Sequence, residues 1–251
     1  MTIFFAIMLG GYFLLLIAFK IGWRKIIRHP SPKGDQVNSI TVLVPFRNEA
    51  KNLGRLCESL SRIRYSTENW QVIFINDHST DNSVEIIESS IRNEPRFLLV
   101  HLDDRQEGKK NALTFGVNRA QGDIIVATDA DCYLPENWLT IINTFFKEDN
   151  IRLAFGGVRL KADDSFFSRL QSIEFLSLIG SGGATLGLGF FSMCNGANLA
   201  FRKSAFEAVN GYDGNLKIAS GDDEFLARKI LLNFPGSVRF INVAEAVVET
   251  E

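Results

Sequence analysis

Two acidic residues one position apart, Asp129 and Asp131, follow directly after the apolar run 124–127. In an extended chain, side chains at positions i and i+2 point to the same side, so this pair concentrates negative charge. Mg²⁺ or Mn²⁺ suits such a pair, because these hard cations bind carboxylate oxygens, keep several waters and bridge phosphate oxygens. A cation there would stabilise the charge of a departing diphosphate. The alternative is that both aspartates begin a solvated turn and cap a helix starting near Pro135.

Short apolar runs and longer amphipathic segments alternate along the chain around these aspartates. The residue pattern predicts strands at 40–45, 71–76, 96–102 and 123–128. Helices are predicted between the strands, at 49–62, 81–92 and 109–120. This βαβαβαβ order predicts an α/β fold with a mostly parallel sheet and helices on both faces.

Polar clusters follow three of the predicted strands, at 45–49, 76–81 and 129–131. In open α/β sheets, ligands bind at the carboxyl ends of the strands. We therefore expect the three clusters to converge on one edge of the sheet and to form one site.

Composition and missing motifs exclude several functions. The 251 residues are 46% hydrophobic and 22% charged with a formal net charge of -2, which argues against disorder and against nucleic-acid binding. The first strand-helix turn lacks the glycines of a dinucleotide-binding site, and no Walker phosphate-binding motif occurs. Three widely spaced cysteines, Cys57, Cys132 and Cys194, are expected to be buried, reduced thiols, which fits a reducing compartment.

The N-terminus differs from the rest of the chain. Residues 3–19 hold no charged side chain, and the length of this run is near the lower limit for a helix that spans a bilayer. Lysines and arginines follow from Lys20 onward, and the positive-inside rule then places the remaining chain in the cytoplasm at the inner or plasma membrane. A cleavable signal peptide or a core helix is the alternative. We predict an anchor at 1–23, a basic, Pro-rich linker at 24–38 and a globular domain at 39–251.

Six motifs occur in order along the chain: VPFRNE at 44–49, INDHSTDNS at 75–83, EGKKNAL at 107–113, DAD at 129–131, NGANLAFRK at 195–203 and GDDEFL at 221–226. Together they resemble the inverting family-2 glycosyltransferases, whose nucleotide-sugar-binding domain has the GT-A fold. The resemblance covers roughly residues 39–250. It implies a GT-A fold, a nucleotide-sugar donor with UDP the common case, a carbohydrate or lipid-linked acceptor, and Mg²⁺ or Mn²⁺ as cofactor.

The resemblance also implies roles for individual residues. Asp77 would hydrogen-bond the nucleobase, Lys109 would contact phosphate or base, Asp129 would face the ribose and the metal, and Asp131 would be the direct metal ligand. The implied nucleotide contacts are Pro45, Arg47, Glu49, Asp77, Lys109, Asp129 and Ala130.

An inverting transfer needs one carboxylate to take the proton of the acceptor hydroxyl. By resemblance Asp223 is that base and Asp222 is its nearest competitor, although acidic residues here could simply stabilise the first turn of a helix. Asn195 and Gly196 are expected on the acceptor side. The apolar, Gly-rich segment 175–199 could line the acceptor pocket, lie against the membrane or pack in the core around a flexible loop.

The chain departs from many membrane-associated relatives in one respect. They carry a Gln-x-x-Arg-Trp motif and further transmembrane helices after the base, and neither occurs before residue 251. We expect either a piece of a longer protein or a short, single-anchor form. The leading hypothesis is a membrane-anchored, metal-dependent glycosyltransferase, and the alternatives are a non-catalytic nucleotide-sugar-binding or assembly module and a nucleotidyltransferase.

Overall fold

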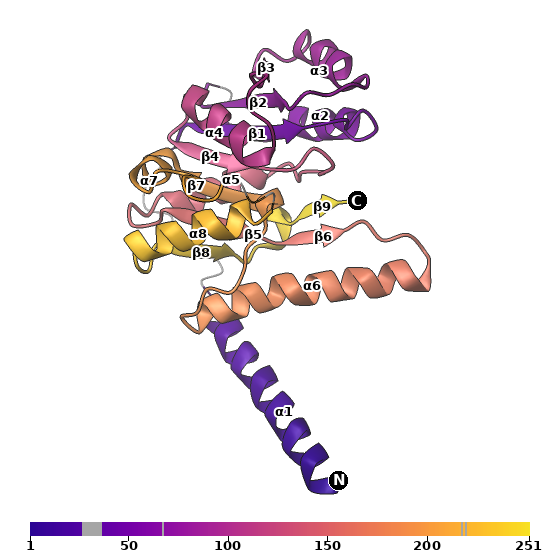
Figure 1. Cartoon of the computed structure of the whole chain (residues 1–251), viewed down its shortest axis with the longest axis vertical. Helices are drawn as coiled ribbons and strands as arrows, with labels where there is room; N and C mark the ends of the chain where they lie inside the picture. The colour runs from indigo at the N-terminus through magenta and orange to yellow at the C-terminus, as the bar shows by residue number, and fades with distance from the viewer. Residues whose placement is uncertain (27–36, 67, 217, 219) are drawn as a thin grey trace.

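In the computed structural model, which describes residues 1–26, 37–66, 68–216, 218 and 220–251, a long N-terminal helix projects from an α/β domain (Figure 1). Most of the predicted linker lies outside these residues. The helices are α1 (Thr2–Lys25), α2 (Leu53–Ser61), α3 (Ser83–Ile91), α4 (Lys109–Arg119), α5 (Trp138–Phe146), α6 (Phe166–Gly187), α7 (Lys203–Ala208) and α8 (Asp222–Asn233), with short 3-10 turns at Gly196–Asn198 and Ala244–Ala246. The strands are β1 (Ile40–Phe46), β2 (Trp70–Asn76), β3 (Phe97–His101), β4 (Ile124–Ala127), β5 (Leu153–Gly156), β6 (Val158–Leu160), β7 (Leu199–Arg202), β8 (Val238–Ile241) and β9 (Val248–Thr250).

The predicted, mostly parallel sheet is confirmed. Seven strands within the described residues are ordered β3-β2-β1-β4-β7-β5-β8. β7 is antiparallel to both neighbours, and the other adjacent pairs are parallel. β6 and β9 form a separate parallel pair beside the sheet.

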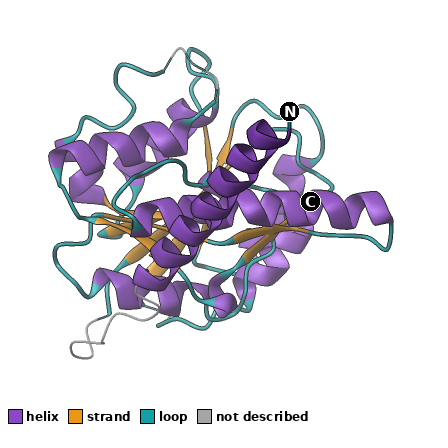
Figure 2. Ribbon diagram, turned by 90° about the horizontal axis from the view of Figure 1, so that it is seen from below, coloured by secondary structure: helices purple, strands orange, loops and turns teal. Residues whose placement is uncertain are grey.

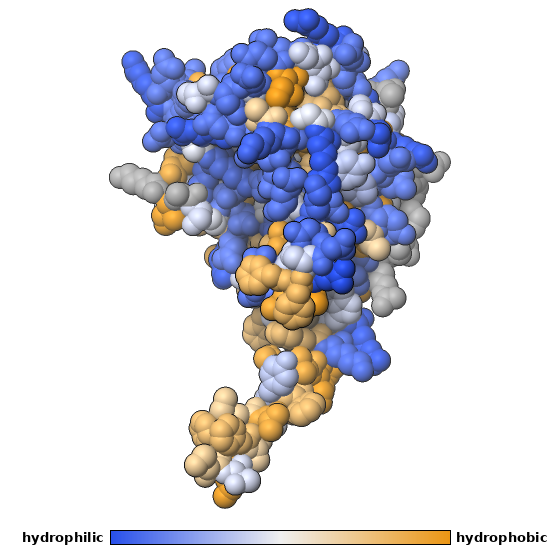
Figure 3. Space-filling model, turned by 90° about the vertical axis from the view of Figure 1, so that its right-hand side faces the viewer, coloured by the Kyte–Doolittle hydropathy of each residue, from blue (hydrophilic) through white to orange (hydrophobic). Residues whose placement is uncertain are grey.

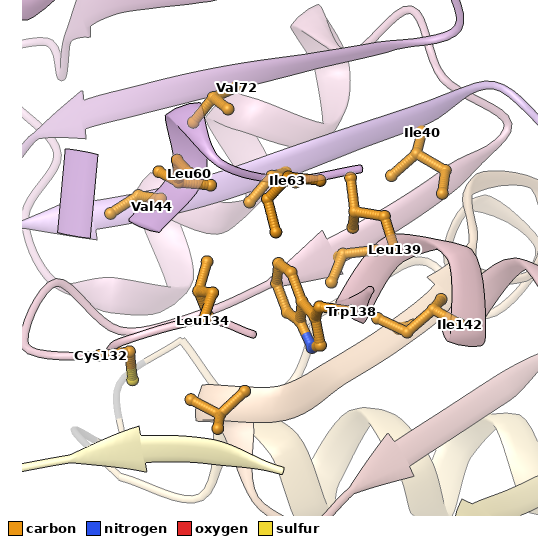
Figure 4. Close-up of a cluster of buried hydrophobic side chains, with 14 of the residues drawn as sticks. Ile40, Val44, Leu60, Ile63, Val72, Cys132, Leu134, Trp138, Leu139 and Ile142 are labelled. Carbon is orange, nitrogen blue, oxygen red and sulfur yellow. The ribbon is translucent and has the colours of Figure 1, made fainter. Parts of the chain in front are cut away.

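Both faces of the sheet are buried, which explains the continuous apolar runs in its strands. Along β1, Val42 and Val44 point into one core cluster and Leu43 points into the other. Helices α2, α3 and α5 cover the first face, and α4, α7 and α8 cover the second. Figure 2 shows helices on both sides of the strands. Trp138 is fully buried in the first cluster and donates its indole N–H to Asn198 Oδ1 at 2.9 Å (Figure 4).

The start of α2 and the segment 175–199 differ from the predictions. Helix α2 begins at Leu53 rather than residue 49, and residues 50–52 form a turn before it. The backbone N–H groups of Glu49 and Ala50 donate to Ser83 Oγ and Asp81 Oδ2. The segment 175–199, for which a flexible loop was one expectation, is helical as far as Gly187. Gly183 and Gly187 lie at close contacts with α1, whereas Gly189 lies in the turn after the helix.

Helix α1 is long and apolar enough to cross a membrane. Its most apolar 18-residue window has a mean hydropathy of 2.4 and is not buried against the domain. The helix leaves the underside of the domain next to α6 (Figure 1). Its exposed apolar side chains run from Ile3 to Ile17, and Figure 3 shows this apolar surface from one side.

Candidate active site

The loops after β1 and β2 are braced against each other at the carboxyl edge of the sheet. Asn48 adopts a left-handed backbone conformation with φ 58°, and its Oδ1 accepts from Thr80 N at 2.7 Å. Asp81 Oδ2 accepts from Ala50 N at 3.1 Å, and its hydrogen bonds, chiefly with Ser83, lower the pKa of Asp81. Asp81 therefore fixes loop geometry.

Asp77 is buried at the end of β2 and connects that strand to the start of α4. Its Oδ2 accepts from the backbone N–H of Gly108 at 2.9 Å. Gly108 has φ 89°, a conformation that glycine adopts without the strain a side chain would bring. The other oxygen, Oδ1, is buried and has no hydrogen-bond partner among the described residues. Asp77 thus offers a fixed acceptor to a ligand, because a buried polar atom without a partner is costly.

Lys109, the first residue of α4, is surrounded by carboxylates from two other elements. Its Nζ lies 2.5 Å from Asp129 Oδ1 after β4 and 3.8 Å from Asp222 Oδ2 at the start of α8. Burial disfavours the ammonium charge, but the carboxylates of Asp129, Asp222 and Asp223 outweigh it and raise the pKa of Lys109. One ammonium therefore joins the segment after β4 to the segment that contains the predicted base.

Asp222 and Asp223 differ in accessibility. Asp222 is buried against Lys109, whereas Asp223 is half-buried. Burial, with a smaller contribution from the Asp222 charge, raises the pKa of Asp223 despite hydrogen bonds from Glu224 N and Gly196 N and the charge of Lys109. An accessible carboxylate with a raised pKa suits a general base better than its buried neighbour.

Gly196 lies in the space between these groups. A Cβ atom built on Gly196 would lie 3.3 Å from Lys109 Nζ and 3.5 Å from Asp222 Oδ2. Asn195 beside it uses its side-chain oxygen to accept from Ala197 N at 2.8 Å. The structure therefore brings Gly196 to the carboxylates, while the Asn195 oxygen supports the local turn.

The prediction that Asp129 and Asp131 lie in an extended chain is wrong. They lie in a turn closed by the bond from Cys132 N to Asp129 O at 3.3 Å, and their side chains bond to different elements. Asp131 Oδ2 accepts from Thr250 Oγ1 at 2.9 Å, and Oδ1 has a weak contact with Cys132 Sγ at 3.7 Å. The helix-cap alternative is not seen, since α5 begins after Asn137 without a side-chain cap.

The oxygen chemistry at this turn fits a hard divalent cation. Within the described residues, no three His, Cys, Asp or Glu side chains gather closely enough to hold an ion by themselves. Mg²⁺ and Mn²⁺ do not require such a cage, since one or two carboxylates with substrate phosphates and water suffice. Asp129 and Asp131 are the carboxylates at this turn, and their present partners are Lys109 and Thr250.

A pocket of about 520 Å³ opens beside Lys109. The residues lining it are Arg47, Glu107, Gly108, Lys109, Lys110, Asn111, Leu216 and Ile218. The structure thus brings Arg47 together with Lys109. Pro45 is half-buried within β1, Glu49 accepts a bond from Asn52, and Ala130 is buried in the core, so these three do not line this pocket.

Two residues at this site were not identified from the sequence. Lys110 is 4% exposed, and its ammonium donates to the carbonyls of Asn215 at 3.2 Å, Ile218 at 2.6 Å and Ser220 at 2.9 Å. It therefore ties α4 to the loop before α8. Thr250 reaches Asp131 from β9. Both sets of contacts join residues more than 100 positions apart in the sequence. The only signal for Lys110 is its place as the second lysine of the GKK segment at 108–110, and Thr250 carries no such signal.

Comparison with curated proteins identifies polysaccharide synthases as relatives. The chain is 29% identical over 192 residues to poly-beta-1,6-N-acetyl-D-glucosamine synthase of Staphylococcus aureus (strain COL), covering 75% of this chain and 45% of that protein. The match to the Staphylococcus epidermidis synthase is 29% over 183 residues, covering 72% and 43%. The chain spans less than half the length of these relatives.

Solved structures confirm the GT-A-like fold. A mannosyltransferase from Pyrobaculum calidifontis, in complex with GDP-Man and Mn²⁺, has a TM-score of 0.69 at 21% identity and covers 94% of this chain and 63% of its own. Staphylococcus aureus TarS 1-349 in complex with UDP-GlcNAc has a TM-score of 0.63 at 18% identity, with 84% and 58% covered.

The family model named Glycosyl transferase family 2 matches residues 41–209. The match includes the segments of Asp77, Lys109, Asp129, Asp131 and Gly196 and ends before the Asp222-Asp223 pair. Because it covers well over half of the chain, the chain belongs to glycosyl transferase family 2.

Proposed function

We propose that this chain is the catalytic part of an inverting, membrane-anchored glycosyltransferase that moves a sugar from a UDP-linked donor to an acceptor hydroxyl. The observation that carries the proposal is the meeting of Asp129, Asp222 and Gly196 around Lys109. Residues suited to a diphosphate and residues suited to an acceptor lie within one site.

On the donor side, the Oδ1 of Asp77, which has no hydrogen-bond partner, would accept an N–H of the nucleobase, and Arg47 lines the pocket beside Lys109. Lys109 faces the diphosphate, where its ammonium attracts negative charge. Asp131 and Asp129 would hold Mg²⁺ or Mn²⁺, which supplies Lewis-acid stabilisation of the departing diphosphate. The mannosyltransferase from Pyrobaculum calidifontis forms a complex with GDP-Man and Mn²⁺, which supports the use of a divalent ion here.

On the acceptor side, Asp223 accepts the proton of the acceptor hydroxyl as that oxygen bonds to the anomeric carbon. The bond between the anomeric carbon and the diphosphate oxygen breaks, and the electron pair leaves with the nucleoside diphosphate. Attack from the face opposite the leaving group inverts the configuration. A raised pKa helps Asp223 to hold the proton during the transfer.

UDP-GlcNAc is the first donor to test, because the curated relatives are poly-N-acetylglucosamine synthases and a structural neighbour binds UDP-GlcNAc. GDP-Man is the comparison donor. Helix α1 is proposed to anchor the domain with residues after Lys20 on the cytoplasmic side. The acceptor is proposed to be a carbohydrate or a lipid-linked carbohydrate. The sugar transferred is the one that the nucleotide donor carries.

Titration calorimetry with UDP-GlcNAc in the presence of Mn²⁺ or Mg²⁺ tests the donor site separately from turnover. Asp131→Asn is expected to weaken metal-dependent binding about tenfold or more, since second- and first-sphere changes cost that much in metal sites. The control is Asp104→Asn, an exposed carboxylate outside the pocket. Binding that is indifferent to both metal and the Asp131 change would contradict the proposed donor site.

A further inference from the structure

Strand β9 contacts the turn that carries the proposed metal-binding carboxylates. Thr250 of this strand donates its hydroxyl to Asp131 Oδ2 at 2.9 Å. The backbone of Glu249 beside it exchanges two hydrogen bonds with the backbone of Tyr133, at 2.7 and 3.1 Å, in an antiparallel bridge. Two backbone bonds therefore fix β9 against the segment that leaves the turn, and the Thr250 hydroxyl reaches Asp131 from this fixed position.

The backbone of β9 is also held by β6. The two strands pair in parallel and lie side by side (Figure 1). Val248 N donates to Gly157 O at 3.1 Å, and the Val248 side chain is fully buried in the core. Lys161 N donates to Thr250 O at 2.7 Å. Because these bonds and a buried side chain hold the strand, Thr250 has little freedom to move away from Asp131.

The carboxylate of Glu249 adds an ionic anchor to β9. Its Oε1 lies 2.5 Å from Arg55 Nη2 of α2, and its Oε2 lies 3.0 Å from Arg159 Nη2 of β6. The Glu249 side chain is 19% exposed, so salt screens these pairs less than pairs on an open surface. The Arg55 guanidinium also lies 4.9 Å from the centre of the Tyr133 ring. The position of β9 is thus tied to α2, to β6 and to the segment after Asp131.

The hydroxyl occupies one oxygen of the Asp131 carboxylate. The other oxygen, Oδ1, has only the weak contact with Cys132 Sγ at 3.7 Å among the described residues. Carboxylates that bind metal ions are commonly held by hydrogen bonds from neighbouring groups, which fix their orientation. Without such a donor, the cation itself must order the side chain, and the lost rotamer freedom counts against binding.

We infer that Thr250 is a positioning residue of the donor site, which orients Asp131 and keeps its Oδ1 available to the divalent cation. Glu249 supports this role by holding β9 in register. The inference rests on the proposed binding of Mg²⁺ or Mn²⁺ by Asp131. It gives a role in the donor site to β9, which lies outside the residues 41–209 that the family model matches.

Electron paramagnetic resonance of Mn²⁺ tests the inference on the full chain in detergent micelles. The Kd for Mn²⁺ is measured with UDP present and without an acceptor, so the result does not depend on sugar transfer. Thr250→Val keeps the shape of the side chain and removes the donor, whereas Thr250→Ser keeps the donor. The matched control is Thr140→Val in α5, because the Thr140 hydroxyl donates to Arg64 O at 2.6 Å, away from the carboxylates of the site.

The Mn²⁺ Kd of Thr250→Val is expected to rise about tenfold or more, because loss of a hydrogen-bonding partner of a metal ligand costs about 10–100-fold in affinity. Thr250→Ser and Thr140→Val should keep the wild-type Kd. An unchanged Kd in Thr250→Val would overturn the inference. An equal rise in Thr250→Ser, or in Thr140→Val, would also overturn it, because the hydroxyl of Thr250 would then have no specific role.

Asp131→Asn separates the inference from the proposed function. If Asp131→Asn weakens Mn²⁺ binding and Thr250→Val does not, the inference fails and the proposed donor site stands. If neither variant changes the Kd, or the wild-type chain binds no Mn²⁺ with UDP, the proposed donor site fails together with the inference.

Discussion

At the scale of single residues, the site is organised by charge around Lys109. Its ammonium contacts Asp129 and lies within 4 Å of Asp222, while Asp223 beside them keeps a raised pKa. The two aspartates of α8 are adjacent in sequence but differ in burial, and this difference separates their roles. Asp222 is held against the lysine, whereas Asp223 is more exposed and is the base in the proposed mechanism.

The pH dependence of transfer should report this pair. The base must be deprotonated, so activity rises with pH through the pKa of Asp223, which burial chiefly and Asp222 secondarily raise. Asp222→Asn removes the carboxylate charge that helps to raise the pKa of Asp223. It also leaves Lys109 with less negative charge nearby, and both effects lower the pKa of Asp223. The acid limb of kcat/KM is therefore expected to move to lower pH, with Asp104→Asn as the unchanged control. Glu224, Arg228, Cys194 and Tyr212 also lie near the pair and are retained in both variants. A limb that moves to higher pH would contradict the assignment.

Lys110 is expected to influence donor binding through the loop that it holds. Lys110→Met removes three donors from the carbonyls of the 215–220 loop, whose Leu216 and Ile218 line the pocket. Loss of even one net hydrogen bond of about 1 kcal/mol predicts a rise of roughly five- to tenfold in the KM for the nucleotide sugar. Lys229→Met is the matched control, because Lys229 also donates to three carbonyls, of Asn210, Gly211 and Asp213, outside the pocket lining. The same change of KM in both variants would mean that Lys110 has only a general structural role.

The sequence identified those site residues that lie in a specific motif or at the end of a predicted element. Asp77 and Asp129 lie in polar clusters at the ends of predicted strands, and the resemblance of the motifs to the family singled out these two residues and Lys109. The partners of Lys110 and Asp131 could not, because burial of a lysine amid carbonyls and the approach of Thr250 depend on how distant segments pack. Spacing alone also gave the wrong geometry for Asp129 and Asp131, since a turn rather than a strand follows Ala127.

At the scale of elements, the strands β1, β2 and β4 match their predicted ranges closely, because parallel strands buried on both faces are uninterrupted apolar runs. Helix α6 was harder to predict, because its glycines and its lack of a one-sided apolar pattern obscure the helical period. Contact with α1 explains two of those glycines, Gly183 and Gly187. Gly22, Gly183 and Gly187 each lie where a side chain would collide with a neighbouring helix or strand.

The crossing of α1 and α6 should not accept a larger residue at position 22. Gly22→Leu places a side chain where Ala184 O already lies, and overpacking of this kind costs about 1–3 kcal/mol. The unfolding midpoint of the full chain in detergent micelles is expected to fall by several degrees, at roughly 2–4 °C per kcal/mol. Gly10→Leu is the control, because no described atom lies within 4 Å of a Cβ there and the gain in helix propensity is the same. Equal midpoints for the two variants would contradict this close crossing.

At the scale of the whole molecule, the α/β order of the first half could be predicted and the second half could not. The predicted strands end at residue 128, and β7 joins the sheet antiparallel to β4 from more than 70 residues later. This long-range pairing places Gly196, just before β7, beside Lys109. The acceptor side of the site is thus a product of topology that no local pattern encodes.

Donor binding should stabilise the whole domain. At a donor concentration of about 100 times Kd, mass action adds roughly 2.7 kcal/mol to the free energy of unfolding. The unfolding midpoint is then expected to rise by about 5–10 °C with UDP-GlcNAc and Mn²⁺. Chelation of the metal by EDTA should remove most of this shift. A shift that persists in EDTA would argue that Asp131 and Asp129 bind no metal.

The central claim is that donor binding and proton transfer use different carboxylates of one site. The direct measurement is the rate of sugar transfer by Asp223→Asn at saturating donor, with donor Kd measured on the same sample. The matched control is Glu224→Gln, the neighbouring carboxylate in the first turn of α8. The account predicts an unchanged Kd with a loss of transfer of about 100-fold or more for Asp223→Asn alone. Transfer by Asp223→Asn at the wild-type rate would contradict it.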